Sequence, residues 1–156
     1  MLELIVAGEQ RQDALGRMLA ERIAPPFILY LQGDLAAGKT TLARGLLRGL
    51  GYEGKVKSPT YTLMEAYELA GAVCYHFDLY RLADAEELLF LGLDDLLREE
   101  AIWLVEWPER GKGILPEADL TISFAHLEEE RILTFSSLRE NGIQIINSLQ
   151  QVWGVG

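Results

Sequence analysis

Residues 33–40 are Gly33-Asp34-Leu35-Ala36-Ala37-Gly38-Lys39-Thr40, and this stretch decides the fold. The spacing G-x-x-x-x-G-K-[ST] is typical of a loop that follows a strand, opens a helix and wraps backbone amides around nucleotide phosphates. Residues 27–32 form an apolar, β-favouring run, which indicates a buried central strand. Residues 41–50 repeat leucine every fourth position, which indicates one stripe of a helix. A loop that only caps a helix is the alternative, but this context favours a phosphate loop that binds ATP or GTP.

Each residue type in the loop has a chemical reason. Gly33 and Gly38 allow backbone angles and close approach that a Cβ would block, so amides and the positive end of the helix can face an anion. Lys39 brings a mobile charge to the β- and γ-phosphates, and the hydroxyl of Thr40 ligates Mg²⁺. Ala36 stands where many such loops have a further glycine, and a positive φ there would cost about 1 kcal/mol.

Composition limits the classes of protein and partner. The chain has 156 residues, of which 49% are hydrophobic, and we expect one domain over residues 1–156. A formal charge of −10, from 24 acidic and 14 basic residues, argues against a direct grip on nucleic acid. The lone Cys74 lies in an apolar run and is expected to be a buried, reduced thiol. Because no basic leader or apolar span of about 18 residues is present, we expect a soluble, unprocessed, cytoplasmic protein without a membrane partner.

Hydrophobic periodicity and turn residues give the order of the elements. Strands are expected at residues 2–6, 27–32, 61–67, 73–78 and 101–105, and as a hairpin at 120–125 and 132–136. Helices are expected at residues 11–23, 41–50, 83–91, 93–98 and 142–152. Strands that alternate with helices imply a P-loop NTPase-like, three-layer α/β domain with a mixed, mostly parallel sheet and a C-terminal antiparallel hairpin.

Two acids follow apolar runs at the positions where such sheets bind ligands. Glu106 comes directly after residues 101–105, which is the position of an acid that holds Mg²⁺ directly or through water. Asp78 ends the preceding strand and could orient the attacking water, accept its proton or support the metal ligands. A solvated carboxylate at a strand end is the alternative for both.

Other polar and aromatic residues leave more than one interpretation open. The segment Ser58-Pro59-Thr60-Tyr61-Thr62 occupies the position of a switch loop, so Thr60 or Thr62 could sense a γ-phosphate. A proline turn whose hydroxyls bond the local backbone is the alternative. His76 is interpreted as a packed strand histidine, because no Cys/His pair has zinc spacing. Trp103 and Trp107 are interpreted as core or rim aromatics.

Four segments together resemble the bacterial TsaE (YjeE) family. They are the loop at residues 33–41, the segment at 58–62, His76-Phe77-Asp78-Leu79-Tyr80-Arg81, and Val105-Glu106-Trp107-Pro108. Their order and spacing match as well, and the similarity runs from about Glu9 to the hairpin after Asp119. The H-F-D-L-Y-R and E-W-P signatures are far more specific than the loop alone. Ala36 departs from the glycine usual in the family, which bears on loop geometry and hydrolysis rate.

The resemblance implies an ATPase component of the machinery that makes N6-threonylcarbamoyladenosine on tRNAs reading codons that begin with A. Its partners would be TsaB and TsaD, while TsaC supplies threonylcarbamoyl-AMP, and tRNA would be contacted only indirectly. The cofactors would be ATP and Mg²⁺, with the metal held by Thr40 and Glu106. Lys39, Asp78 and Glu106 would carry the chemistry. The expected nucleotide contacts are Glu9, Gly33, Ala37, Gly38, Lys39, Thr40, Thr41, Leu42 and Arg131.

Other functions share parts of this pattern. A P-loop small-molecule kinase has the same phosphate loop, lysine and Mg²⁺, but normally adds an arginine-bearing lid that the sequence lacks. A GTPase is disfavoured because no N-K-x-D tetrad is present. A nucleotide-gated binding module, in which the bound state acts without obligatory hydrolysis, is the alternative from another class.

Overall fold

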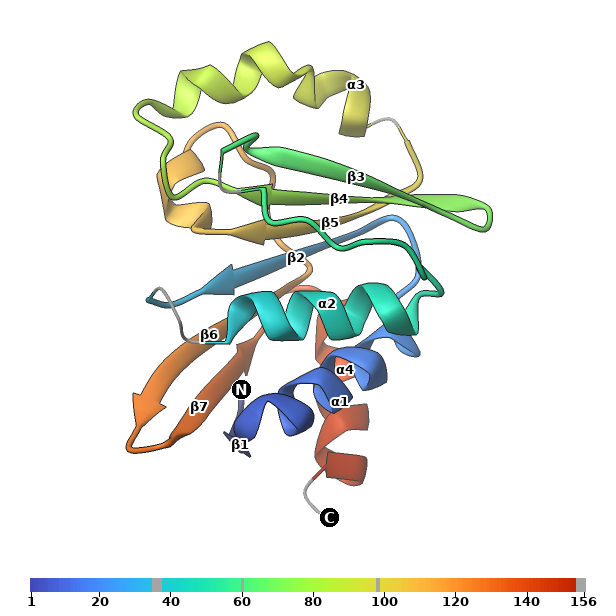
Figure 1. The fold of residues 1–156 in the computed structure, drawn as a ribbon, viewed down its shortest axis with the longest axis vertical. Helices are drawn as coiled ribbons and strands as arrows, with labels where there is room; N and C mark the ends of the chain where they lie inside the picture. Colours follow the sequence, from blue (N-terminus) through green and yellow to red (C-terminus); the bar gives the residue numbers. More distant parts are fainter. Residues whose placement is uncertain (35–37, 60, 98, 154–156) are drawn as a thin grey trace.

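A central β-sheet organises the computed structural model, which describes residues 1–34, 38–59, 61–97 and 99–153 (Figure 1). The strands are β1 (Leu2–Ala7), β2 (Phe27–Gln32), β3 (Met64–Leu69), β4 (Ala72–Asp78), β5 (Ala101–Glu106), β6 (Leu120–Leu127) and β7 (Glu130–Ser136). The α-helices are α1 (Gly8–Ala20), α2 (Lys39–Gly49), α3 (Leu93–Leu97) and α4 (Glu140–Trp153), and the 3₁₀ helices are η1 (Ala85–Leu91) and η2 (Pro108–Gly111). None of the helices in these ranges has the length and apolar character that a membrane crossing requires.

The described strands form one mixed sheet in the order β1-β7-β6-β2-β5-β4-β3. The pairings β6–β2, β2–β5 and β5–β4 are parallel, and the outer pairings β1–β7, β7–β6 and β4–β3 are antiparallel. The expected mixed sheet and C-terminal hairpin are therefore confirmed, and the sheet is partly parallel, with its three parallel pairings at the centre and three antiparallel pairings outside them. Since β2, β4 and β5 run in one direction, the ends of β4 and β5 meet the start of the loop after β2.

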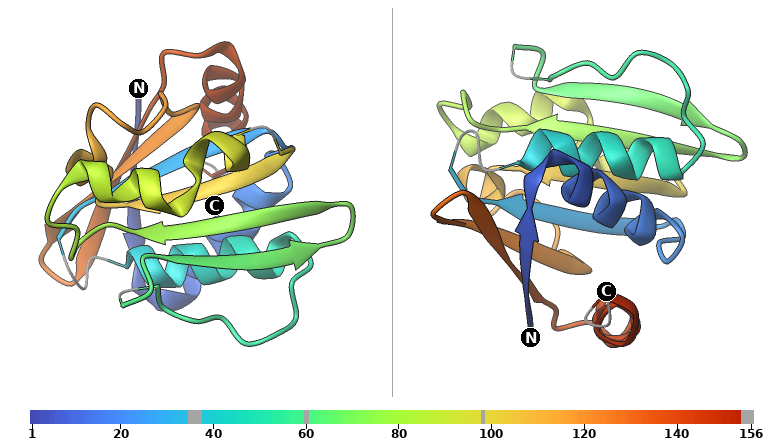
Figure 2. Two further views of the ribbon diagram at one scale, coloured as in Figure 1. Left: turned by 90° about the horizontal axis from the view of Figure 1, so that it is seen from above. Right: turned by 60° about the horizontal axis from the view of Figure 1, so that its bottom comes forward.

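Helices cover both faces of the sheet, as the three-layer expectation requires (Figure 2). Leu29 and Leu31 of β2 pack with apolar residues of α1, α2 and α4 in one buried cluster. On the opposite face, Trp103 and Val105 of β5 pack with residues of η1 and α3 in a second cluster. Alternate residues of one strand thus enter different cores, because successive side chains point to opposite faces.

Two glycines allow α1 and α2 to lie side by side (Figure 2). A Cβ on Gly16 would lie 2.4 Å from the carbonyl oxygen of Leu42, and a Cβ on Gly45 would lie 2.4 Å from that of Asp13. Real Cβ atoms do not approach backbone this closely, so only glycine permits the contact. This packing sets the first turn of α1 beside the first turn of α2.

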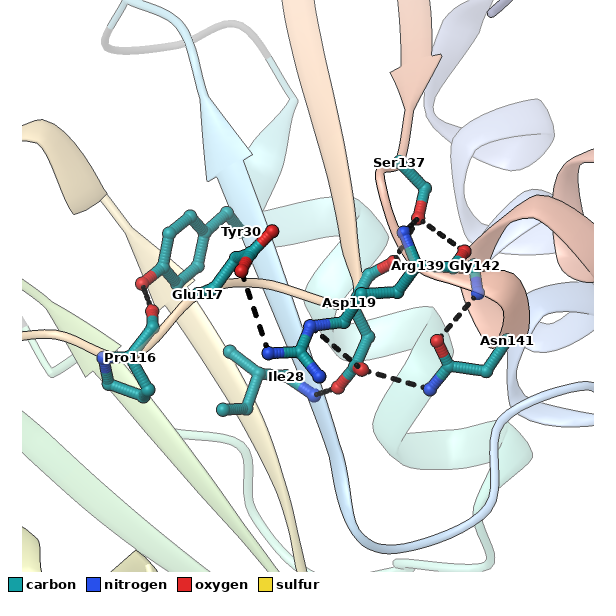
Figure 3. Close-up of polar contacts among 9 residues, drawn as sticks. All are labelled: Ile28, Tyr30, Pro116, Glu117, Asp119, Ser137, Arg139, Asn141 and Gly142. Atoms are coloured by element: carbon teal, nitrogen blue, oxygen red, sulfur yellow. Dashed lines mark hydrogen bonds and ion pairs between the residues drawn. The ribbon is translucent and has the colours of Figure 1, made fainter.

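A polar network anchors α4 near the start of β2, at the end of that strand away from Gln32 (Figure 3). The carboxylate of Asp119 accepts hydrogen bonds from the Ile28 backbone amide, at 2.8 Å, and from Asn141 Nδ2, at 2.9 Å. The Ser137 hydroxyl donates to the Asp119 carbonyl at 2.6 Å, and Arg139 lies 3.9 Å from the Asp119 carboxylate. These contacts hold the connection between β7 and α4 against the starts of β2 and β6.

Several element boundaries differ from the sequence expectation. The strand expected over residues 61–67 begins at Met64, because Leu63 has a φ of +67° and interrupts the extended backbone. The helix expected over residues 11–23 begins at Gly8 and ends at Ala20. The helical segment expected over residues 83–91 is the 3₁₀ helix η1, whose start is capped by Asp84 and Glu87. The last helix begins two residues earlier than expected, at Glu140.

Replacement of Gly45 by alanine is expected to destabilise the protein by about 1–3 kcal/mol, because the added methyl group crowds the Asp13 carbonyl. Alanine alone favours a helix over glycine by up to about 1 kcal/mol, so helix propensity predicts the opposite sign. Urea unfolding measures the difference. The neighbouring exposed Arg44→Ala is the control and should change stability by less than about 0.5 kcal/mol. A stabilised Gly45→Ala variant would show that the two helices do not touch as described.

Candidate functional site

The turn into α2 leaves a set of backbone donors open at its end. Gly38 precedes the helix with a φ of +100°, in the left-handed region, and its carbonyl accepts the Leu42 amide at 3.0 Å. The amides of residues 39–41 come before any carbonyl of their own helix that could accept them. The aligned peptide dipoles also make this end of α2 positive. The first turn of α2 is therefore a site that favours an anion.

The ammonium group of Lys39 lies at this end of the helix, in a position that is almost fully enclosed. The residue is 4% exposed, Nζ donates a hydrogen bond to the Gly33 carbonyl at 2.5 Å, and the ring centroid of Trp107 lies 4.2 Å away. Burial lowers the pKa of Lys39, and the charges of Glu106 and Asp78 oppose that shift. The ammonium group thus lies close to the carbonyl of Gly33 and to the carboxylates of Glu106 and Asp78, all of which carry partial or full negative charge.

Two buried carboxylates end the neighbouring strands β4 and β5. Asp78 and Glu106 are direct partners in the parallel register, and they are 8% and 5% exposed. Oε2 of Glu106 lies 2.7 Å from His76 Nε2, and Oδ1 of Asp78 accepts the Tyr80 amide at 3.1 Å. Both carboxylates are therefore held by the fold rather than solvated at a strand end, which was the alternative.

A cavity of about 320 Å³ joins these groups. Its lining residues are Gly8, Glu9, Gln12, Gly38, Lys39, Thr40, Thr41, Glu106, Glu129 and Arg131. Seven of these were expected from the sequence to contact nucleotide or metal, and they come from α1, α2, β5 and β7. One end of the cavity thus lies at the first turn of α2, which favours an anion. The other end lies between α1 and the β6–β7 hairpin.

The other expected site residues lie outside that lining. Asp78 is adjacent to Glu106 in the sheet, and Gly33, with a φ of +142°, supplies the carbonyl that accepts Lys39. Leu42 is buried in the core at 1% exposure, and its amide donates to Gly38. Its contact with a phosphate stays a prediction. Ala37 falls outside the described residues.

The proposed switch segment is described only in part. Thr60 lies outside the described residues, as does Ala36 in the phosphate loop. Thr62 is exposed, and its hydroxyl donates to Glu65 Oε1 at 3.2 Å, which is a local bond to a side chain and not the backbone bond of the proline-turn alternative. A γ-phosphate contact by either threonine stays a prediction.

Sequence reasoning missed three residues of the lining, namely Gly8, Gln12 and Glu129. Gln12 lies one helical turn after Glu9, so the two residues share a face of α1, and this spacing was the available signal. Its Oε1 is buried and has no hydrogen-bond partner among the described residues. Glu129 lies in the hairpin turn, two residues before Arg131. In a turn, the sequence alone does not predict which way a side chain points.

The remaining chemistry-bearing residues have the packing roles expected of them. Trp103 and Cys74 are buried in the two cores, and burial raises the pKa of the Cys74 thiol to about 12. His76 is a buried strand histidine, with the added contact to Glu106 that the sequence did not reveal. Trp107 is a rim aromatic with a φ of +57°, and its ring lies 5.0 Å from that of Tyr80.

The residues present fit a magnesium ion that is held mainly by phosphate and water. The Thr40 hydroxyl and the buried Glu106 carboxylate line the same cavity, and both offer the oxygen ligands that Mg²⁺ prefers. Within the described part of the chain, no three or more His, Cys, Asp or Glu side chains are arranged so that they could hold a metal ion by themselves. A Mg²⁺ ion commonly uses one or two protein carboxylates together with substrate phosphates, so this sparse set suffices.

Because the turn into α2 and the strand-end acids meet at the carboxyl edge of a partly parallel sheet, the chain has the architecture of P-loop-like α/β proteins. Comparison with known proteins assigns it more narrowly. The family model described as "Threonylcarbamoyl adenosine biosynthesis protein TsaE" matches residues 6–133. The chain belongs to the TsaE family.

Individual relatives agree with this assignment. The "tRNA threonylcarbamoyladenosine biosynthesis protein TsaE" of Haemophilus influenzae is 51% identical over 121 residues, covering 78% of this chain and 77% of that protein. The Bacillus subtilis protein of the same name is 36% identical over 130 residues, covering 83% and 81%. The crystal structure of YdiB from Bacillus subtilis superposes with a TM-score of 0.78 at 28% identity, over 96% of this chain and 94% of that chain.

Replacement of Gly38 by alanine tests the geometry of the turn. The positive φ should cost about 1–2 kcal/mol of stability, and the new Cβ would lie 2.2 Å from Gln12 Nε2, which adds crowding. Gly51→Ala is a matched control, since its φ is +98° and no atom lies within 4 Å of the added Cβ. In urea unfolding, Gly38→Ala should lose more stability than Gly51→Ala, and Gln12→Ala should recover the difference. Equal losses would mean that Gln12 does not pack against the loop.

Proposed function

We propose that this chain is a Mg²⁺-dependent ATPase that serves tRNA threonylcarbamoyladenosine biosynthesis by acting on a TsaB–TsaD complex. The cavity at the first turn of α2, where a buried lysine faces two buried carboxylates, is the observation that carries the proposal. Family membership supports the pathway.

The phosphates would lie at the first turn of α2. The amides of residues 39–41 and the positive helix end favour a polyanion there, with no need for a side-chain cap. Lys39 Nζ, now hydrogen-bonded to the Gly33 carbonyl, would donate to the β- and γ-phosphate oxygens instead. Exchanging a neutral carbonyl for a charged oxygen strengthens the hydrogen bond and keeps the ammonium protonated.

Thr40 and Glu106 would hold the metal at the edge of the cavity. When bound, Mg²⁺ supplies charge stabilisation to the transferring phosphoryl group. Glu106 offers a carboxylate that the fold buries at the end of β5. Thr40 offers a hydroxyl from the first turn of the helix.

Asp78 would orient the attacking water or accept its proton. It is buried next to Glu106 at the end of β4, and the Tyr80 amide donates to one of its oxygens. A carboxylate at this point reaches the γ-phosphate end of the site, because the phosphates begin at α2 beside the same sheet edge.

Glu9 and Arg131 would contact the rest of the nucleotide. They line the cavity from α1 and β7, on the side away from the strand ends, and the Arg131 backbone is held in register with Val6. A cavity of about 320 Å³ is within the usual size of small-molecule sites. The base and ribose would therefore lie between α1 and the hairpin.

The Lys39→Ala and Glu106→Ala variants separate binding from hydrolysis. Lys39→Ala should lose ATP affinity by at least about tenfold, because a charged phosphate contact is removed. Glu106→Ala should keep nucleotide binding but lose turnover by about 10²-fold or more. Calorimetry and phosphate release measure the two effects, with the exposed Lys55→Ala as a control. Binding without turnover in the wild type, alone and with TsaB and TsaD, would favour a nucleotide-gated module instead.

The partnership with TsaB and TsaD is proposed from the family resemblance and is consistent with charge. A formal charge of −10 disfavours a direct grip on tRNA, so a subunit that acts on the other components fits the chain. Reconstitution tests this role. Modified tRNA should form over many turnovers only when this chain, TsaB, TsaD and ATP are all present. Full turnover without the chain, or with Lys39→Ala in its place, would contradict the partnership.

A further inference from the structure

One buried side chain next to the site has no part in the function described so far. His76 is 1% exposed on β4, and its Nε2 lies 2.7 Å from Oε2 of Glu106. Its Nδ1 is buried and has no hydrogen-bond partner among the described residues. The contact with Glu106 is therefore the one polar contact that the described structure gives this ring.

The sheet geometry makes this contact a directed one. His76 and Asp78 are two residues apart on β4, so they point to the same face of the sheet. His76 is in register with Leu104 and Asp78 with Glu106, so the imidazole reaches diagonally to the last residue of β5. That face is the one covered by α1 and α2, because Cys74 and Leu104 belong to the same core cluster as those helices.

The chemistry of the pair assigns the roles of its atoms. A carboxylate only accepts hydrogen bonds, so Nε2–H donates to Oε2. The donated bond fixes Oε2 and with it the plane of the Glu106 carboxylate, which leaves Oε1 as the oxygen that His76 does not hold.

We propose that His76 is a positioning residue for the magnesium ligand, setting Glu106 in the orientation in which its other oxygen can meet the metal at Thr40. The inference rests on the proposed function. Outer partners that orient a metal ligand typically contribute about 10–100-fold to metal affinity or activity. His76 itself is not among the residues that line the cavity.

The test compares His76→Gln and His76→Leu by calorimetry of ATP binding at a series of Mg²⁺ concentrations. Mg²⁺ should increase the ATP affinity of the wild type. In His76→Leu, the Mg²⁺ concentration that gives half of this increase should be about 10–100-fold higher. His76→Gln places an amide nitrogen near the former Nε2 and should restore most of the response. ATP affinity without Mg²⁺ should stay within about twofold of the wild type in both, because His76 does not contact the phosphates.

Cys74→Ala is the matched control for a merely structural role. Cys74 is fully buried on the same face of β4, two residues before His76, and it shares no hydrogen bond with Glu106. It should lower the melting temperature and leave the Mg²⁺ response unchanged. Equal shifts in Cys74→Ala and His76→Leu would overturn the inference, since general loosening of the core would explain both.

The outcomes also separate this inference from the proposed function. A wild type that binds ATP more tightly with Mg²⁺, together with a His76→Leu variant that responds identically, would overturn the inference alone. A wild type whose ATP affinity does not depend on Mg²⁺ would contradict the magnesium site and this inference together. The expected result is a shifted response in His76→Leu, a restored one in His76→Gln and an unshifted one in Cys74→Ala.

Discussion

The enclosed ammonium group of Lys39 is the constraint on which the rest of the site depends. A buried charge is costly unless it is paired, and here a backbone carbonyl, an aromatic ring and the charges of Glu106 and Asp78 surround it. The two carboxylates would themselves be unfavourable as buried neighbours without that cation. The group is therefore mutually stabilised, and an anion that enters the cavity changes the balance of all three charges.

The backbone holds this arrangement from both sides. Parallel pairing of β4 with β5 fixes Asp78 beside Glu106, and the left-handed Gly38, which precedes α2, lines the same cavity as Glu106. The close contact of α1 with α2, through Gly16 and Gly45, completes the cavity with the first turn of α1. The shape of the cavity thus depends on the close packing of α1 and α2 at two glycines that do not line the cavity themselves.

Local sequence patterns were sufficient for the elements that frame the site. The strand at residues 27–32 has the expected bounds, because a six-residue apolar run between turn signals is hard to interpret otherwise. Glu106 was identified from its place after residues 101–105. By contrast, β3 begins three residues late, because the positive φ of Leu63 depends on its tertiary contacts rather than on its type.

Contacts between distant segments could not be derived from local pattern. Gln12 enters the cavity because α1 packs on α2, and His76 meets Glu106 because β4 pairs with β5 in one particular register. Both residues looked like ordinary helix and strand positions in the sequence.

A crystal structure of the chain with Mg²⁺ and a non-hydrolysable ATP analogue tests the central claim most directly. We expect Lys39 Nζ to leave the Gly33 carbonyl and to lie about 2.7–3.0 Å from a phosphate oxygen, with the amides of residues 39–41 on the same phosphates and Glu106 and Thr40 facing the metal. Phosphates bound elsewhere on the chain, with Lys39 still on the Gly33 carbonyl, would contradict the account.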